Sequence, residues 1–218
     1  MAIISSRSAD RLAAPTVLAP ERYDPRRELS SKVSSAPLNE IVEIVKQTVQ
    51  TKDAIKPALV LDTSDAREGF VIARKQPTTD IGSTKKTTQP GDVIISRLRP
   101  YLRQVALVDE AIPNSSNAQI LCSTEFFVLR SINRESIAFL VPFLLTESVQ
   151  QVLAASQEGG HHPRFDSTVL LALPIPTAML DVRQDVSTRV ERAAKLYREA
   201  ELTIDDYIEQ ASQLIKGR

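Results

Sequence analysis

The C-terminal stretch of the chain constrains its fold more than any other part of the sequence. Between Pro176 and Gly217 there is no glycine or proline, so about forty residues can form one uninterrupted helix with Thr177 as its N-cap. Apolar and small residues recur along it at alternating spacings of four and three, the pattern of a helix that packs against another helix. These seam positions are Val186, Val190, Ala193, Tyr197, Ala200, Ile204, Tyr207, Ala211 and Leu214.

The length of this helix bears on how it packs. At about 1.5 Å per residue the seam spans roughly 40 Å, which exceeds the docking face of a compact domain of this size. We therefore predict that residues 177–218 project as a coiled-coil helix that pairs with a partner. The alternative is a long helix that folds back onto its own domain.

The residues before the helix predict one globular domain. A chain of 218 residues with 42% hydrophobic and 25% charged residues has the composition of a folded globular protein. Residues 1–20 follow no sustained period and are predicted to form a loosely ordered lead-in, which leaves 21–176 as the domain. Short β-rich runs between turn residues predict strands at Ala58–Leu61, Gly69–Ala73, Asp92–Ser96, Gln104–Val108 and Glu125–Leu129.

A helix and a last strand complete the predicted domain. The run Ile137–Leu153 has helical spacing and stops before Gly159. Val169–Leu173 is apolar and predicts a buried strand, ended by Pro174 and Pro176, which cannot donate to a sheet ladder. We therefore predict an α/β (α+β) domain with a mixed sheet, followed by one long coiled-coil helix.

The sequence lacks the motifs of common enzyme cores and ligand sites. No Walker loop, dinucleotide-binding glycine turn, His-Glu-x-x-His helix or Gly-x-Ser-x-Gly elbow is present, so we expect a protein without catalytic activity of its own. Cys122, His161 and His162 lack the spacing of metal ligands, and we expect neither a metal nor a cofactor in this chain.

Other sequence features indicate the compartment. A single cysteine cannot form an internal disulfide, and the N-terminus lacks a secretory pattern, so we expect the cytoplasm. The longest nearly uncharged apolar stretch, Ile137–Leu145, is far shorter than the roughly 20 residues of a membrane helix, and no membrane partner is expected.

Local charge in the middle of the chain suggests a nucleic-acid partner, although the formal net charge is zero. From Arg67 to Arg103, three acidic residues (Glu68, Asp80 and Asp92) stand against eight basic ones, and an ordinary solvated surface is the alternative explanation. The eight are Arg67, Arg74, Lys75, Lys85, Lys86, Arg97, Arg99 and Arg103.

A second candidate segment is the loop Gly159–Arg164, which combines two glycines, two histidines and an arginine. Such a loop offers backbone and side-chain donors to a phosphate or a base edge. A plain surface loop between two elements is the alternative. From both segments we select as DNA-contact candidates Lys85, Lys86, Arg97, Arg99, Arg103, His161, His162 and Arg164.

The segment Gly91–Pro100 (GDVIISRLRP) resembles the glycine-aspartate-strand-arginine-proline stretch in the target recognition domains of type I restriction-modification DNA specificity subunits. The later order of parts is also similar to that family: a strand, a helix, a glycine-bearing loop, and Leu173–Pro176 (LPIP) before a long helix. The segment Glu21–Pro25 (ERYDP) is similar to the start of some members. The chain has room for one recognition domain and one helix, so it resembles half a subunit.

The resemblance implies a DNA recognition subunit of a methylation-based defence complex, such as a restriction-modification system active against phage. Such a subunit places a partner adenine methyltransferase, which binds S-adenosylmethionine, on a bipartite double-stranded DNA target. Two half subunits would form a homodimer through their helices. A nuclease or translocase subunit is left open as a further partner. The alternative function is a protein-interaction adaptor that acts through its helix and does not read DNA.

Overall fold

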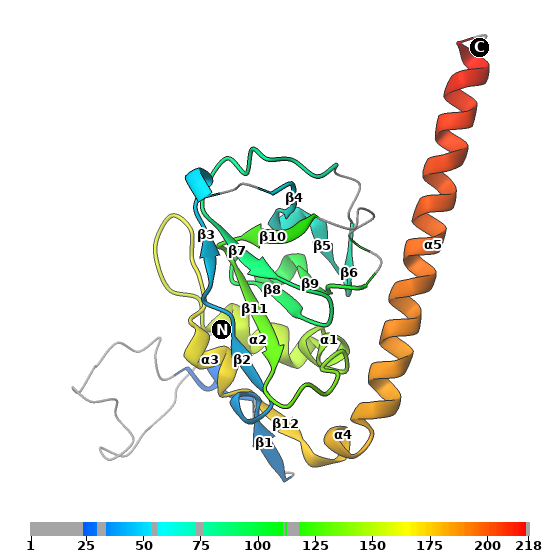
Figure 1. The fold of residues 1–218 in the computed structure, drawn as a ribbon. Helices are drawn as coiled ribbons and strands as arrows, with labels where there is room; N and C mark the ends of the chain where they lie inside the picture. Colours follow the sequence, from blue (N-terminus) through cyan, green and yellow to red (C-terminus); the bar gives the residue numbers. More distant parts are fainter. Residues whose placement is uncertain are drawn as a thin grey trace.

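The computed structural model describes residues 24–29, 34–53, 56–72, 76–110, 112 and 118–216. The predicted lead-in 1–20, most of the segment 21–25, and the predicted basic residues Arg74 and Lys75 lie outside the described residues. The domain has three layers in which two four-stranded sheets stack and short helices cover one of them (Figure 1). It is a mixed α+β fold followed by a long helix, as predicted.

The central layer is an antiparallel sheet in the order β2-β11-β8-β9. Successive residues of a strand point to opposite faces of the sheet, and in these strands both sets are apolar because both faces are covered. In β8, Val93 and Ile95 face the helices, whereas Ile94 faces the second sheet. The strands are β2 (Val42–Ile44), β8 (Val93–Ser96), β9 (Val105–Leu107) and β11 (Phe126–Ser131).

The second sheet has the order β3-β7-β10-β4 and is mixed, because β10 pairs with β4 in parallel and with β7 antiparallel. The predicted strand Ala58–Leu61 has the predicted bounds, whereas β7 and β10 were not predicted. One hydrophobic core lies between the sheets and includes Leu59, Cys122 and Phe126. The strands are β3 (Thr48–Val49), β4 (Ala58–Leu61), β7 (Lys85–Thr88) and β10 (Gln119–Ser123).

Helices cover the outer face of the central sheet, and two predictions for this region are wrong. The predicted helix 137–153 is two helices, α1 (Leu140–Leu144) and α2 (Glu147–Ala155), because Thr146 is extended and its side chain caps α2. The predicted strand Val169–Leu173 is mostly the helix α3 (Ser167–Leu171), because Asp166 accepts a capping hydrogen bond from the Thr168 backbone N–H at 2.8 Å.

The strand at this position is instead β12 (Pro174–Pro176), which pairs with β1 (Ser35–Pro37). Both strands contain prolines, which a two-stranded ribbon tolerates because few ladder donors are needed. The flanking backbone supplies two of them: Leu38 donates to the Leu173 carbonyl at 3.0 Å, and Thr177 donates to the Ser34 carbonyl at 2.9 Å.

A small hairpin of β5 (Ala66–Arg67) and β6 (Phe70–Val71) lies beside β9. Gly69 at its turn has φ of 105° and donates to the Val105 carbonyl at 2.7 Å. A side chain there would meet both a disfavoured backbone conformation and Val141, 3.2 Å from the ideal Cβ position.

The C-terminal stretch is not one helix, as predicted, but α4 (Thr177–Asp181) and α5 (Arg183–Ile215), separated at Val182. Val182 leaves the helical conformation with ψ of 7°, and Arg183 Nη1 donates to the Leu180 carbonyl at 3.0 Å at the end of α4. The break lets α4 contact β12 while α5 takes its own direction. No helix in the described part is long and apolar enough to cross a membrane.

The first half of α5 packs on its own domain and the second half extends beyond it (Figure 1). Val186 and Val190 pack against the core, and the Tyr197 ring stacks on Phe70 with 4.5 Å between centroids. These three seam residues thus pack, partly buried, against their own domain, whereas the prediction assigned them to a partner helix. The other seam residues, Ala193, Ala200, Ile204, Tyr207, Ala211 and Leu214, are exposed.

Candidate nucleic-acid interface

The loop predicted to contact DNA, Gly159–Arg164, lies with its flanking residues over the end of β8 and the start of β11. Main-chain hydrogen bonds hold it there: the Phe165 N–H donates to the Arg97 carbonyl at 3.3 Å, and the Arg97 N–H donates to the Glu125 carbonyl at 3.0 Å. Leu98 and Arg164 form an antiparallel bridge. The sheet therefore brings the two candidate segments of the sequence together, although about sixty residues separate them.

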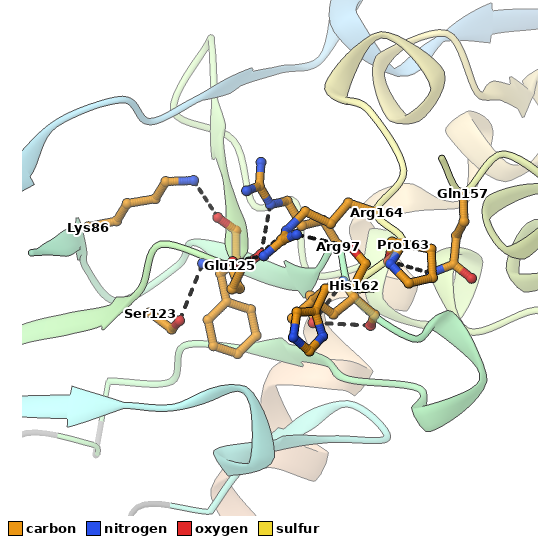
Figure 2. A network of polar contacts seen from close by, with 11 residues as sticks. Lys86, Arg97, Ser123, Glu125, Gln157, His162, Pro163 and Arg164 are labelled. Carbon is orange, nitrogen blue, oxygen red and sulfur yellow. Dashed lines mark hydrogen bonds and ion pairs between the residues drawn. The ribbon is translucent and has the colours of Figure 1, made fainter. Parts of the chain in front are cut away.

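Glu125 joins the two segments through its side chain (Figure 2). Its Oε2 accepts from Arg97 Nε at 2.9 Å and from Arg164 Nε at 2.9 Å, and its Oε1 accepts from Arg164 Nη2 at 2.7 Å. We call Arg97, Glu125 and Arg164 the Glu125 cluster. Glu125 was not among the predicted site residues, because a glutamate just before a strand carries no local sign of the arginines that bind it.

The cluster strongly favours the ionised carboxylate. Hydrogen bonds from Arg164 and then Arg97 lower the pKa of Glu125 from 4.5 to about 2, against the opposing effect of burial. Because the pKa is lower in the folded state, the stabilisation is complete above about pH 5 and is lost as the pH falls towards 2.

We therefore expect the melting temperature of E125Q to fall below that of the native chain at neutral pH, and the difference to shrink between pH 5 and pH 2. The neutral glutamine loses the charged hydrogen bonds at every pH, whereas the native glutamate loses them only on protonation. Thermal melts in steps of pH measure this, with E199Q on the exposed surface of α5 as the control. A difference that stays constant down to pH 2 would contradict the assignment.

Lys86 lies beside the cluster but is largely engaged in the fold (Figure 2). Its Nζ donates to the Phe126 carbonyl at 2.6 Å and lies 5.5 Å from the centre of the Phe127 ring. Burial lowers the pKa of this lysine. Lys85, on the same strand, donates to Ser83 at 2.7 Å. Each of these two lysines therefore donates to a neutral oxygen of the protein, so fewer of its N–H donors are available to a partner than its position in the sequence suggests.

Arg99 and Arg103 lie apart from the cluster. They do not continue the face of β8, because that strand ends at Ser96 and the chain turns away. Arg99 and Arg103 have φ of 46° and 53° and flank the short helix η7 (Pro100–Leu102), which packs against α2. Arg103 Nε lies 3.6 Å from a Glu68 carboxylate oxygen, and Arg99 is exposed.

The two histidines are exposed at the tip of the loop, with 6.0 Å between their ring centres. Arg164 Nη1 donates to the His162 carbonyl at 2.9 Å, and Gln157 Nε2 donates to the Pro163 carbonyl at 3.0 Å, so the loop shape is held from inside. Gly159 has φ of 101°, which glycine adopts readily. Within the described ranges, no group of three or more His, Cys, Asp or Glu could hold a metal.

Comparisons with known proteins support the fold only through solved structures. No protein-family model matches the chain, and no curated protein matches it significantly. A chain in a structure of a type I R-M system, described for its complex assembly and conformational transition, is 22% identical with a TM-score of 0.55. That match covers 86% of this chain and 50% of the other.

A second solved structure is the HsdS subunit from Thermoanaerobacter tengcongensis, which is 20% identical with a TM-score of 0.47 over 86% of this chain and 49% of that subunit. This chain thus spans about half the length of the solved chains that it matches. It has the fold of a chain from a type I restriction-modification system.

Proposed function

We propose that the chain is a sequence-specific DNA recognition subunit of a methylation-based restriction-modification complex. The observation that carries the proposal is the Glu125 cluster with its ordered loop, which holds the Arg97 guanidinium through Nε at the end of a rigid sheet. Arginine forks on a rigid support suit the edges of bases and phosphates. The fold shared with a type I R-M chain agrees with this function.

In the proposed complex the chain performs no chemistry. It places an adenine methyltransferase on DNA, and that partner binds S-adenosylmethionine. A nuclease or translocase subunit would be a further partner of the same complex. In the proposed homodimer, two copies would supply the two recognition domains of a bipartite, two-fold related target.

The test is co-expression with an adenine methyltransferase from the same genome, followed by sequencing of the host DNA for methylated adenines. We expect a stable complex and one bipartite methylated motif. A matched strain that lacks this chain should show no such motif. If the two proteins do not form a complex and no motif is methylated, the proposal fails.

The exposed half of α5 is the proposed self-association surface. Its apolar residues lie at helical spacings of three and four and form one continuous stripe, which we call the distal stripe. Large apolar side chains there are more than half exposed, which is unusual unless a partner covers them. The distal stripe consists of Ile204, Tyr207, Ile208, Ala211, Leu214 and Ile215.

We expect I204D/I208D to abolish a dimer in solution, because two buried carboxylates per helix would face each other across the pair. The mass measured by sedimentation or light scattering should fall from two chains to one. V190D is not suitable for this purpose, because Val190 packs on its own domain. The control is T203D, an exposed position beside the stripe. An unchanged mass for I204D/I208D would exclude the distal stripe as this surface.

The second candidate function is a protein-interaction adaptor, which the exposed distal stripe alone also supports. DNA binding separates the two functions. An adaptor would bind a protein through the distal stripe, and it would bind neither an adenine methyltransferase nor DNA. Sequence-selective DNA binding that changes on substitution of the Glu125 cluster favours the recognition subunit.

A further inference from the structure

The two arginines of the Glu125 cluster are held in different ways. Arg164 uses all three of its nitrogen positions within the protein: Nε and Nη2 donate to Glu125, and Nη1 donates to the His162 carbonyl. Arg97 uses only Nε, which donates to Glu125. Neither terminal nitrogen of Arg97 donates to another residue that the structure describes.

This arrangement orients Arg97. Its backbone is held at both polar groups, by Glu125 on one side and Phe165 on the other, and its side chain is held at Nε. A guanidinium fixed through Nε keeps four N–H donors on Nη1 and Nη2 in one plane at the free end. About a third of the Arg97 side chain is exposed.

The surroundings favour a base edge over a phosphate as the partner of this fork. A phosphate contact needs positive charge, yet Glu125 places a carboxylate between the arginines, so the cluster carries a net charge of only one. Lys86, beside the cluster, is partly buried and donates to the Phe126 carbonyl, so its ammonium group is held within the protein. A base edge instead requires a fork of defined direction, and guanine offers two acceptors, O6 and N7, at matching separation.

We infer that Arg97 is the residue that reads a guanine in the major groove, donating from Nη1 and Nη2 to O6 and N7. Glu125 and Arg164 are then positioning residues: Glu125 holds the fork of Arg97, and Arg164 fastens the loop to Glu125. The inference rests on the proposed DNA-recognition function and deepens it by naming one base and its reader.

The experiment selects bound sequences from a random double-stranded DNA library with the full chain, alone and co-purified with its methyltransferase. Native protein should enrich a motif that contains at least one guanine. R97A should lose the preference at one guanine position by about tenfold to one hundredfold and keep the rest of the motif. R97K, which keeps the charge but not the fork, should lose the same preference. R189A, on the exposed surface of α5, is the control.

E125Q gives a readout that misfolding would not produce. Removal of one negative charge should strengthen binding to unrelated DNA at low salt, while the preference at the same guanine falls because the fork is no longer held. A thermal melt of each variant confirms that it is folded.

The possible outcomes distinguish a failure of the Arg97 inference from a failure of the proposed function. If R97A and R97K bind every sequence more weakly or equally but keep the native motif, Arg97 is a phosphate contact or a bystander, and the inference fails while the proposed function stands. If the native chain enriches no motif in either form, the proposed function fails, and the inference fails with it.

Discussion

R198A is expected to lower the free energy of unfolding by about 3–5 kcal/mol, the range for removing one partner of a buried ion pair. Arg198 is 5% exposed and fastens α5 to the domain. It donates to the Val71 carbonyl at 2.7 Å, to Asp109 at 3.0 Å and to Glu201 on its own helix. Without the guanidinium, the carboxylates of Asp109 and Glu201 lose its charge in a position with little access to water.

The measurements are a denaturant titration and amide hydrogen exchange along α5. Exchange should accelerate between Ser187 and Glu201, the docked half, and change little in the distal half. R198M/E201M should recover part of the loss, because apolar side chains of similar volume need no charge partner. The control R189A removes an exposed ion pair with Asp185 and should cost at most about 1 kcal/mol. A loss for R198A no larger than that of R189A would contradict the assignment.

D92A is expected to cost about 3 kcal/mol, because Asp92 is buried and accepts four hydrogen bonds. Arg130 donates to it twice, at 2.8 and 2.6 Å, and Thr88 Oγ1 and the Gln89 backbone N–H donate at 3.1 and 2.9 Å. These contacts join the end of β7, the start of β8 and the last residues of β11. The aspartate of the Gly91–Pro100 segment is therefore structural.

The location of Asp92 allows a sharper test. It lies at the opposite end of β8 from Arg97, so D92A should keep the base preference of the native chain at temperatures where it is folded. Thermal melting and library selection measure the two properties on one preparation. D206A, an exposed acidic residue on α5, should change stability by less than about 0.5 kcal/mol. A D92A variant as stable as D206A would show that this carboxylate does not hold the strands together.

The sequence correctly predicted those strands that a short run of neighbouring residues identifies. The strand Ala58–Leu61 was found at its own bounds, and β8 and β11 within a few residues, because short apolar runs between turn residues suffice to identify them. The same rule failed at Val169–Leu173, where a local cap from Asp166 makes a helix of an apolar run. A short apolar run can form either a strand or a helix, and here the N-cap residue favours the helix.

The candidate site was only partly predictable. The sequence indicated Arg97 and Arg164 as separate candidates, because arginine in a basic stretch and in a glycine-bearing loop is a local feature. It did not indicate Glu125, which gains its role only when β11 lies beside β8 and the loop folds over both. It also indicated Lys86 as a DNA-contact candidate, although the sheet brings that amine to a carbonyl and an aromatic ring.

Local spacing was enough to predict the long amphipathic helix α5, because intervals of three and four are a property of neighbouring residues. Which part of that helix is exposed depends on tertiary contacts. Val190 and Ile204 occupy equivalent seam positions, yet the first is packed on the domain and the second is exposed. Helical periodicity shows that a face is apolar, but what covers it depends on contacts with residues such as Phe70 and Asp109, which are distant in the sequence.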